Sequence, residues 1–298
     1  MIGHQTISPS LTTTYQEAVE RIAALQTLDD DSILPESGTH LFAHGEKTER
    51  AIILLHGYTS NPRQYRILAE EFFQHGYNVF VPRFPGHGFK DRMTSVLQDQ
   101  TENSLLAFTN EAMDMAHGLG DQITVLGCSM GGVLALWLAQ YRPDISLACA
   151  LSPALAFHAI PLKLTTAIIK YFLVAPNQFN WWDPQTKDQA IPPLHAYPRY
   201  GTRGLAHIAN IGLKIRSTSR RSQPKAGSVL LILNPTDESV NNAYAYEIAS
   251  NWKMLGYPNL RTYEFDAKHN LIHDLIEPDQ LKQQIALVYP ILLDLIAG

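Results

Sequence analysis

Residues 122–141 read QITVLGCSMGGVLALWLAQY, with the pattern Gly127-x-Ser129-x-Gly131 in the middle of the stretch. The apolar run before the pattern indicates a buried strand, and residues 131–141 have the composition of a buried helix. A serine on a tight turn between a strand and a helix exposes its hydroxyl for attack on a carbonyl, and the flanking glycines relieve crowding there. The helix also directs free N–H groups and the positive end of its dipole toward developing negative charge. We therefore expect Ser129 to be a nucleophile.

Residues 123–141 of this stretch carry no charge, and this uncharged run is nearly long enough to span a membrane. Its glycine-rich centre is unsuited to one continuous helix, so we expect no transmembrane segment. The first residues, Met1 to Gln5, lack the basic start and apolar core of a secretory signal peptide. Cys128 and Cys149 each lie within an apolar run, where a free cysteine behaves as a small buried hydrophobe. These features favour a reducing, cytoplasmic compartment.

Apolar runs of strand length alternate with helical patterns along most of the chain. Strands are expected at 51–55, 78–82, 122–126, 145–151, 228–233 and 261–265, and helices at about 15–28, 62–76, 101–117, 131–141, 242–255 and 279–296. This alternation predicts an α/β fold with a mostly parallel central sheet and helices on both faces. The alternation stops at 153–225, a proline-rich block with helical stretches such as 164–174 and no clear strand. We expect this block to be an inserted, largely helical cap on a core formed by 1–152 and 226–298.

Composition limits the classes of function. The formal net charge is −5, and the basic clusters are short, so a nucleic-acid partner is not expected. The twelve histidines are scattered without the ligand spacing of a zinc motif, so no metal site is expected. The oligomeric state does not follow from the sequence.

A second motif, His56-Gly57-Tyr58-Thr59, directly follows the first apolar strand. A tetrahedral intermediate needs two preorganised hydrogen-bond donors for its oxyanion. The backbone N–H groups of Tyr58 and of Met130, the residue after the nucleophile, are the candidate donors. His56 is expected to hold the loop by hydrogen bonds.

These motifs, together with Pro85-Gly86-His87-Gly88, resemble those of the α/β-hydrolase superfamily. The resemblance is greatest to bacterial carboxylesterases and monoacylglycerol-lipase-like enzymes with an inserted cap. The chain departs from the lipases with three glycines after the histidine, because Tyr58 follows Gly57. The resemblance implies the α/β-hydrolase fold and a catalytic triad in the chain order serine, acid, histidine.

The resemblance also suggests the acid and the base. Asp237, in the loop after strand 228–233, fits the spacing of the family's acid loop better than its neighbour Glu238. Two histidines follow strand 261–265. His273, within His-Asp-Leu-Ile-Glu-Pro, resembles the base of a bacterial subgroup and is the favoured assignment, and His269 is its rival.

The implied activity is hydrolysis of carboxylic esters by a serine esterase or lipase-like enzyme without a cofactor. Apolar residues of the inserted block, among them Phe172, Trp181 and Trp182, are expected to bind small to medium acyl chains or monoacylglycerol-like substrates. No chemical role is evident for the stretch from Trp181 to Pro184. Thioester, amide or C–C bond hydrolysis, acyl transfer, and a non-catalytic ligand-binding role stay open, because a fold does not fix a function.

Overall fold

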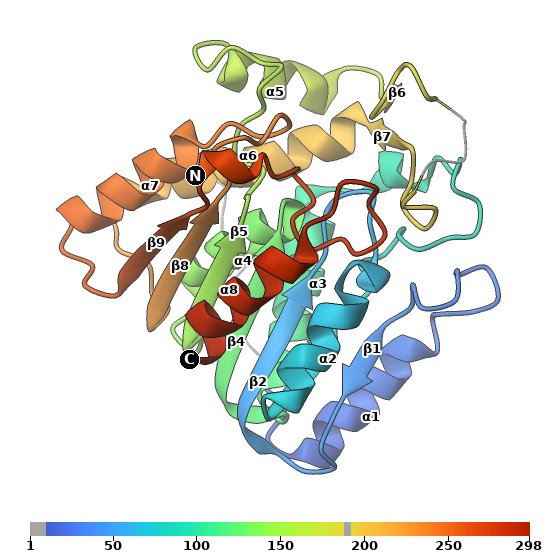
Figure 1. Ribbon diagram of the computed structural model, residues 1–298, viewed down its shortest axis with the longest axis vertical. Coiled ribbons are helices and arrows are strands. Elements are labelled where there is room, and N and C mark those ends of the chain that lie inside the picture. Colours follow the sequence, from blue (N-terminus) through green and yellow to red (C-terminus); the bar gives the residue numbers. More distant parts are fainter. Residues whose placement is uncertain (1–9, 188–191) are drawn as a thin grey trace.

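The computed structural model describes residues 10–187 and 192–298, so the start of the chain, where no signal peptide is expected, lies outside the described residues. At its centre is a seven-stranded sheet with the strand order β1-β3-β2-β4-β5-β8-β9 (Figure 1). β1 is antiparallel to β3, and the other neighbouring strands of this sheet are parallel. The prediction of a mostly parallel sheet with helices on both faces is confirmed.

Apart from β1, the strands of this sheet correspond to the apolar runs of the sequence. They are β1 (His40–Phe42), β2 (Thr48–Leu55), β3 (Tyr77–Val81), β4 (Gly120–Cys128), β5 (Leu147–Leu151), β8 (Ser228–Leu233) and β9 (Leu260–Glu264). Successive side chains of a strand point to opposite faces, and helices cover both faces here. In β2, Ile52 and Leu54 therefore join one core cluster, and Ile53 and Leu55 join the other.

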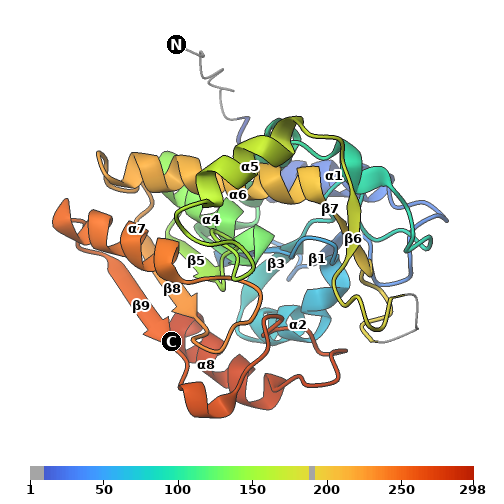
Figure 2. The ribbon, with the colours of Figure 1, turned by 90° about the horizontal axis from the view of Figure 1, so that it is seen from above.

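The helices form two layers on this sheet. They are α1 (Tyr15–Gln26), α2 (Arg66–Gln74), α3 (Glu102–Ala116), α4 (Met130–Tyr141), α7 (Ala243–Met254) and α8 (Ile285–Ala297). α2 and α8 pack in one core cluster, and α1, α3, α4 and α7 pack in the other. Figure 2 shows α2 and α8 on the side of the sheet opposite to α1, α4 and α7.

β1 and the start of the last helix differ most from the sequence prediction. β1 was not predicted, because three half-buried residues are too short for a recognisable alternation. The last helix begins at Ile285 and not near residue 279. The Asp279 side chain accepts hydrogen bonds from Arg63 and Arg66, and the chain runs through turns before α8 begins.

Between β5 and β8 the chain forms α5 (Thr165–Val174), the antiparallel pair β6 (Phe179–Trp181) and β7 (Arg199–Gly201), and α6 (Thr202–Ser219). The expectation of no strand in this block is wrong for β6 and β7, which are short and far apart in the sequence. In Figures 1 and 2, α5 lies alongside α6, above the carboxyl ends of the parallel strands. The buried side chains of Ile208, Ile211 and Ile215 on α6 join the core cluster that contains α4.

The backbones of β2, β4 and α4 approach one another closely at two glycines. A Cβ atom at Gly131 would overlap the carbonyl group of Leu55 at the end of β2, and one at Gly127 would overlap the carbonyl group of Gly131. The first turn of α4 therefore lies directly against the end of β2, which brings Ser129 beside the loop that follows β2.

Gly131→Ala is expected to lower the free energy of unfolding by at least about 3 kcal/mol, because neither backbone can move away without breaking the sheet. Gly45→Ala is the control, since Gly45 has a φ of 89° but open space around it. It should cost only about 1–2 kcal/mol from backbone strain. Urea unfolding of both variants measures the difference, and equal losses would contradict the close approach.

Candidate active site

Ser129 occupies the turn between β4 and α4. Its φ of 56° and ψ of −110° form a backbone conformation that residues other than glycine rarely adopt, at a cost of about 1–3 kcal/mol. The Ser129 N–H donates to the carbonyl oxygen of Leu151 at 3.0 Å, and the Ser129 carbonyl oxygen accepts from the N–H groups of Val133 and Ala154 at 3.1 Å each. These hydrogen bonds hold the strained turn, with the serine side chain toward the carboxyl ends of the strands.

His273 lies between Ser129 and Asp237. Its Nε2 atom is 2.9 Å from the Ser129 hydroxyl oxygen, and its Nδ1 atom is 2.6 Å from Asp237 Oδ2. Because an ionised carboxylate can only accept, Nδ1 carries a proton and Nε2 is left to accept the hydroxyl proton. The structure therefore brings Ser129, His273 and Asp237 into one chain of hydrogen bonds, in the arrangement that a serine nucleophile, its base and an orienting acid require.

The Asp237 carboxylate is held from both sides. Its Oδ1 atom accepts from the N–H groups of Ser239 and Val240 at 2.9 Å each, while Oδ2 faces the imidazole. The side chain is 1% exposed, whereas the neighbouring Glu238 is an exposed residue. The structure thus places Asp237, and not its rival Glu238, against a histidine.

The other histidine of this loop lies elsewhere. His269 ends a short 3-10 helix (Ala267–His269), and its carbonyl oxygen accepts from the side chain of Gln284. Within residues 10–187 and 192–298, no hydrogen bond joins its ring to Ser129 or Asp237. The structure brings His273, and not His269, to the serine.

The loop before His273 is anchored by the loop that carries Asp237. The Asn234 side-chain amide donates to the carbonyl oxygens of Leu271 at 2.9 Å and Ile272 at 3.1 Å. The Thr236 hydroxyl donates to the Leu271 carbonyl at 3.0 Å. These contacts fix the distance between Asp237 and His273, and sequence spacing gave no sign of them.

The two ionisable groups of the site shift each other's pKa. Burial would raise the pKa of Asp237, but the hydrogen bond and charge of His273 and two backbone N–H groups hold it below its ordinary value. Burial would lower the pKa of His273, but the hydrogen bond and charge of Asp237, with the charge of Asp274, raise it above 6.5. The imidazole is therefore neutral, and able to accept a proton, only above this raised pKa.

The expected oxyanion donors, Tyr58 and Met130, both lie beside Ser129. Met130 is the first residue of α4, so its N–H has no carbonyl partner one turn earlier in the helix. A Cβ atom at Gly57 would be 3.6 Å from the Ser129 Cβ atom, which places the loop after β2 next to the serine. The Tyr58 hydroxyl donates to the Gly201 carbonyl at 3.2 Å, which fixes this side chain beneath α6.

His56 connects two loops. Its Nδ1 atom is 2.9 Å from the carbonyl oxygen of Gly57, and its Nε2 atom accepts from the Phe84 N–H at 3.2 Å. Burial lowers the pKa of His56 well below its ordinary value, so the ring is neutral. His87 packs edge-on against His56, and burial lowers the pKa of His87 to about 4. Both rings hold the loops around Ser129.

A cavity of about 940 Å³ opens over Ser129 and His273. The expected binding residues Phe172, Trp181 and Trp182 all line it. So do four other apolar residues of the inserted block, Phe157, Ile160, Ile168 and Ile169. Sequence reasoning missed the lining residues of α6, because this helix was not recognised as a separate element. They are Thr202, Leu205, Ala206, Ile208 and Ala209.

Trp182 also joins the inserted block to the loop after β2. Its indole N–H donates to the Thr59 hydroxyl at 2.8 Å, and its ring packs on Tyr200 with the centroids 4.3 Å apart. The tryptophan pair, for which the sequence suggested no chemical role, thus forms a wall of the cavity and contacts the residue after Tyr58.

In the described part of the chain, no helix is both long and apolar enough to cross a membrane.

Comparison with known proteins agrees with this architecture. Residues 46–192 match the family model described as serine aminopeptidase, S33. A thermostable monoacylglycerol lipase from Bacillus sp. (strain H-257) is 35% identical over 127 residues, which cover 42% of this chain and 47% of the lipase. The chain thus matches about half the length of this curated relative.

Solved structures match over most of the chain. A structure from work on LipS and LipT, two metagenome-derived lipolytic enzymes, has a TM-score of 0.67 at 22% identity and covers 89% of this chain and 98% of its own. A soluble variant of monoglyceride lipase from Saccharomyces cerevisiae, in complex with a substrate analogue, has a TM-score of 0.65 at 13% identity. The match covers 86% of this chain and 89% of the lipase chain. At these identities the likeness shows the fold alone. Fold, family model and relatives agree, so the chain has the α/β-hydrolase fold, and its sequence is similar to that of α/β-hydrolases over residues 46–192.

Proposed function

We propose that the protein is a serine esterase that cleaves carboxylic esters through an acyl-enzyme intermediate. The observation that carries this proposal is the unbroken chain of hydrogen bonds from the Ser129 hydroxyl through His273 to Asp237. Such a chain activates an otherwise weak nucleophile, because the base is already within hydrogen-bond distance of the proton that it removes.

The proposed reaction has two halves. Ser129 Oγ adds to the ester carbonyl while its proton passes to His273 Nε2, and the N–H groups of Tyr58 and Met130 stabilise the oxyanion. When the intermediate collapses, the C–O bond to the alcohol breaks and His273 protonates the leaving oxygen. Water then attacks the acyl-enzyme with His273 as base, and the carboxylic acid leaves with Ser129 regenerated. Every proton in this scheme is held by a residue of the site or by water, so no cofactor is required.

The cavity supports an apolar acyl group as substrate. Its lining is aromatic and aliphatic along α5 and α6, which suits esters of small to medium acyl chains or monoacylglycerols. The names of the monoacylglycerol lipase relative and of the monoglyceride lipase with a similar fold support the same class. We assign residues 153–225 the role of a cap, since they supply most of this lining.

The test is hydrolysis of a series of p-nitrophenyl esters and monoacylglycerols that differ only in acyl length. We expect turnover of the esters, and Ser129→Ala should lower kcat by at least about 10³-fold and abolish labelling by a fluorophosphonate. Because the matching family model is described as an aminopeptidase, aminoacyl p-nitroanilides form the contrasting series. Preferred cleavage of these amides, or labelling at another serine, would contradict the proposal.

The two histidines of the base loop provide a matched comparison within this test. His273→Ala should lower kcat about as much as Ser129→Ala, because the members of a triad act as a unit. His269→Ala should keep kcat within about threefold of the wild type, since His273, and not His269, forms the hydrogen bonds to Ser129 and Asp237. The reverse order of effects would make His269 the base.

A pH profile tests the electrostatics of the site. For an uncharged ester, kcat/KM should rise with pH through one ionisation whose midpoint lies above 6.5, because only neutral His273 can accept the proton. Asp237→Asn should lower this midpoint, since burial then lowers the pKa of His273 without an opposing carboxylate. The same substitution should lower kcat by about 10⁴-fold. Glu238→Gln is the control, and a shift as large as that of Asp237→Asn would contradict the assignment of the acid.

The acyl pocket is tested with two neighbouring aromatic residues of α5. Phe172 lines the cavity, whereas Tyr171 is 63% exposed. Phe172→Ala should weaken discrimination between long and short acyl esters by about 1–3 kcal/mol, with little change for an acetyl ester. Tyr171→Ala should leave the chain-length profile unchanged. If neither variant alters the profile in kcat/KM, the acyl group binds elsewhere.

A further inference from the structure

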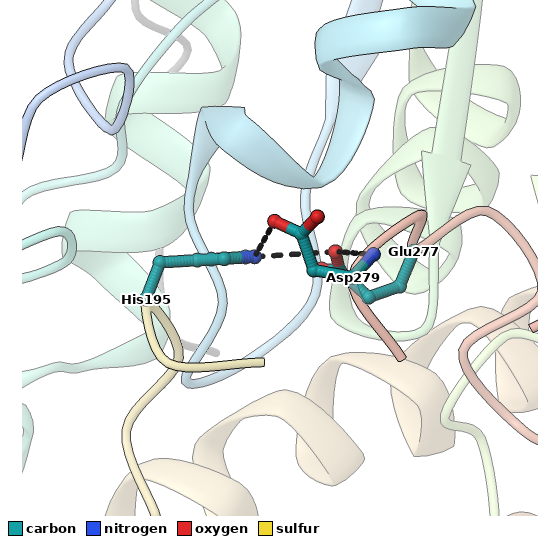
Figure 3. A group of neighbouring side chains, drawn as sticks. All are labelled: His195, Glu277 and Asp279. Carbon is teal, nitrogen blue, oxygen red and sulfur yellow. Dashed lines mark hydrogen bonds and ion pairs between the residues drawn. The ribbon is translucent and has the colours of Figure 1, made fainter. Parts of the chain in front are cut away.

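A second cluster of ionisable side chains lies beyond the hydrogen-bonded chain of the active site. His195, from the inserted block, faces Glu277 and Asp279 from the loop before α8 (Figure 3). The His195 Nε2 atom is 3.1 Å from Glu277 Oε1 and 3.7 Å from Asp279 Oδ2. The side chains of His195 and Glu277 are 3% and 1% exposed. Burial of a carboxylate at this depth is costly unless it is paired, so the contact with His195 matters.

A metal ion is one interpretation of this cluster, because one ligand atom from each residue lies within 4.8 Å of the others. The surrounding charges argue against it. Asp279 already binds two guanidinium groups, with Arg63 Nε 3.1 Å from Oδ2 and Arg66 Nη2 2.9 Å from Oδ1. The distance between His195 and Glu277 fits a direct hydrogen bond, and Glu277 Oε1 also accepts from the Asp279 N–H at 3.1 Å. We therefore interpret the cluster as a network of hydrogen bonds and ion pairs.

The Glu277 carboxylate stabilises the turn that directly follows His273. Glu277 is four residues beyond His273, and its N–H donates to the Asp274 carbonyl at 3.2 Å. The Asp279 N–H donates to Glu277 Oε1 at 3.1 Å, so this oxygen accepts from both His195 and the Asp279 backbone. The side of the loop before His273 is held by Asn234 and Thr236, and Glu277 holds the side after it.

The histidine of the network belongs to a segment that also contacts the loop after β2. The Asn61 side-chain amide donates to the His195 carbonyl at 2.8 Å. Two residues later, the Tyr197 N–H donates to the Thr59 carbonyl at 2.8 Å, directly after the expected oxyanion donor Tyr58. Residues 195–197 thus connect the loop that carries Tyr58 to the loop that carries His273.

We propose that His195 and Glu277 are positioning residues, which hold His273 at its working distance from Ser129 by joining the inserted block to the base loop. The proposal rests on the proposed esterase function. The inserted block then helps to assemble the catalytic groups in addition to forming the wall of the cavity. A displacement of a base by about 1 Å can lower the rate by about 10²-fold. A residue that does not touch the substrate can therefore still affect turnover.

The proposed positioning depends on the hydrogen bond that His195 Nε2 donates to the Glu277 carboxylate, which can only accept. His195→Leu removes this donor and leaves a buried carboxylate without its partner, whereas His195→Gln places an amide N–H near the position of Nε2. With a short ester, we expect His195→Leu to lower kcat by about 10–100-fold with KM within about threefold, and His195→Gln to stay within about threefold of the wild type. Each kcat is divided by the number of sites that a fluorophosphonate titrates, so unfolded protein does not count.

His117→Leu is the matched control. The His117 Nε2 atom is 2.8 Å from Asp144 Oδ2, in a histidine–carboxylate pair at the opposite ends of the strands from Ser129. This variant should lower the unfolding temperature without changing kcat per titrated site. If His195→Leu behaves in the same way, or if His195→Gln is as slow as His195→Leu, the positioning role is wrong.

Two further measurements keep the outcome decisive. If His195→Leu does not fold, Asp279→Asn replaces it, because Asp279 is a partly exposed member of the network. This substitution should lower kcat by about 3–10-fold, and an unchanged kcat would overturn the proposal. A wild-type kcat that falls with EDTA and returns with Zn²⁺ would show that the cluster is a metal site. A wild-type protein that neither hydrolyses esters nor reacts with the fluorophosphonate would instead overturn the proposed function, before any variant is compared.

Discussion

At Gly131 the first turn of α4 lies so close to the end of β2 that the carbonyl group of Leu55 occupies the space a side chain would need. This contact fixes the start of α4 against the strand that leads into the Tyr58 loop. Ser129 is held in its strained conformation between two rigid elements, so the turn cannot relax. The position of Ser129 relative to both expected oxyanion donors follows from this one approach of two backbones.

The remaining polar groups depend on the parallel sheet. Ser129 follows β4, Asp237 follows β8 and His273 follows β9, so all three lie at the same edge of the sheet. The hydrogen bonds from Asn234 to the chain before His273 then hold His273 Nδ1 at 2.6 Å from Asp237 Oδ2. Burial of Asp237 makes its charge more effective, because little water competes for the carboxylate.

The inserted block is connected to the core more extensively than a separate lid would be. α6 contributes to the same core cluster as α4, and Trp182 and Tyr197 bind the two sides of Thr59, through its hydroxyl and its carbonyl. His195 adds a contact to the base loop. These contacts offer a physical route by which binding against the wall of the cavity can influence the groups around Ser129.

Sequence alone determined the apolar runs that form the parallel strands and the serine at the strand–helix turn, because each depends on a local pattern. The acidic residue after β8 was expected from the family resemblance. Tertiary structure placed His273, and not His269, beside Ser129, since both lie in one irregular loop whose course is set by contacts with Asn234, far away in the sequence. It also decided the late start of α8. The Asp279 side chain pairs with Arg63 from another element, and such a long-range ion pair overrides local helix propensity without leaving a periodic signal in the sequence.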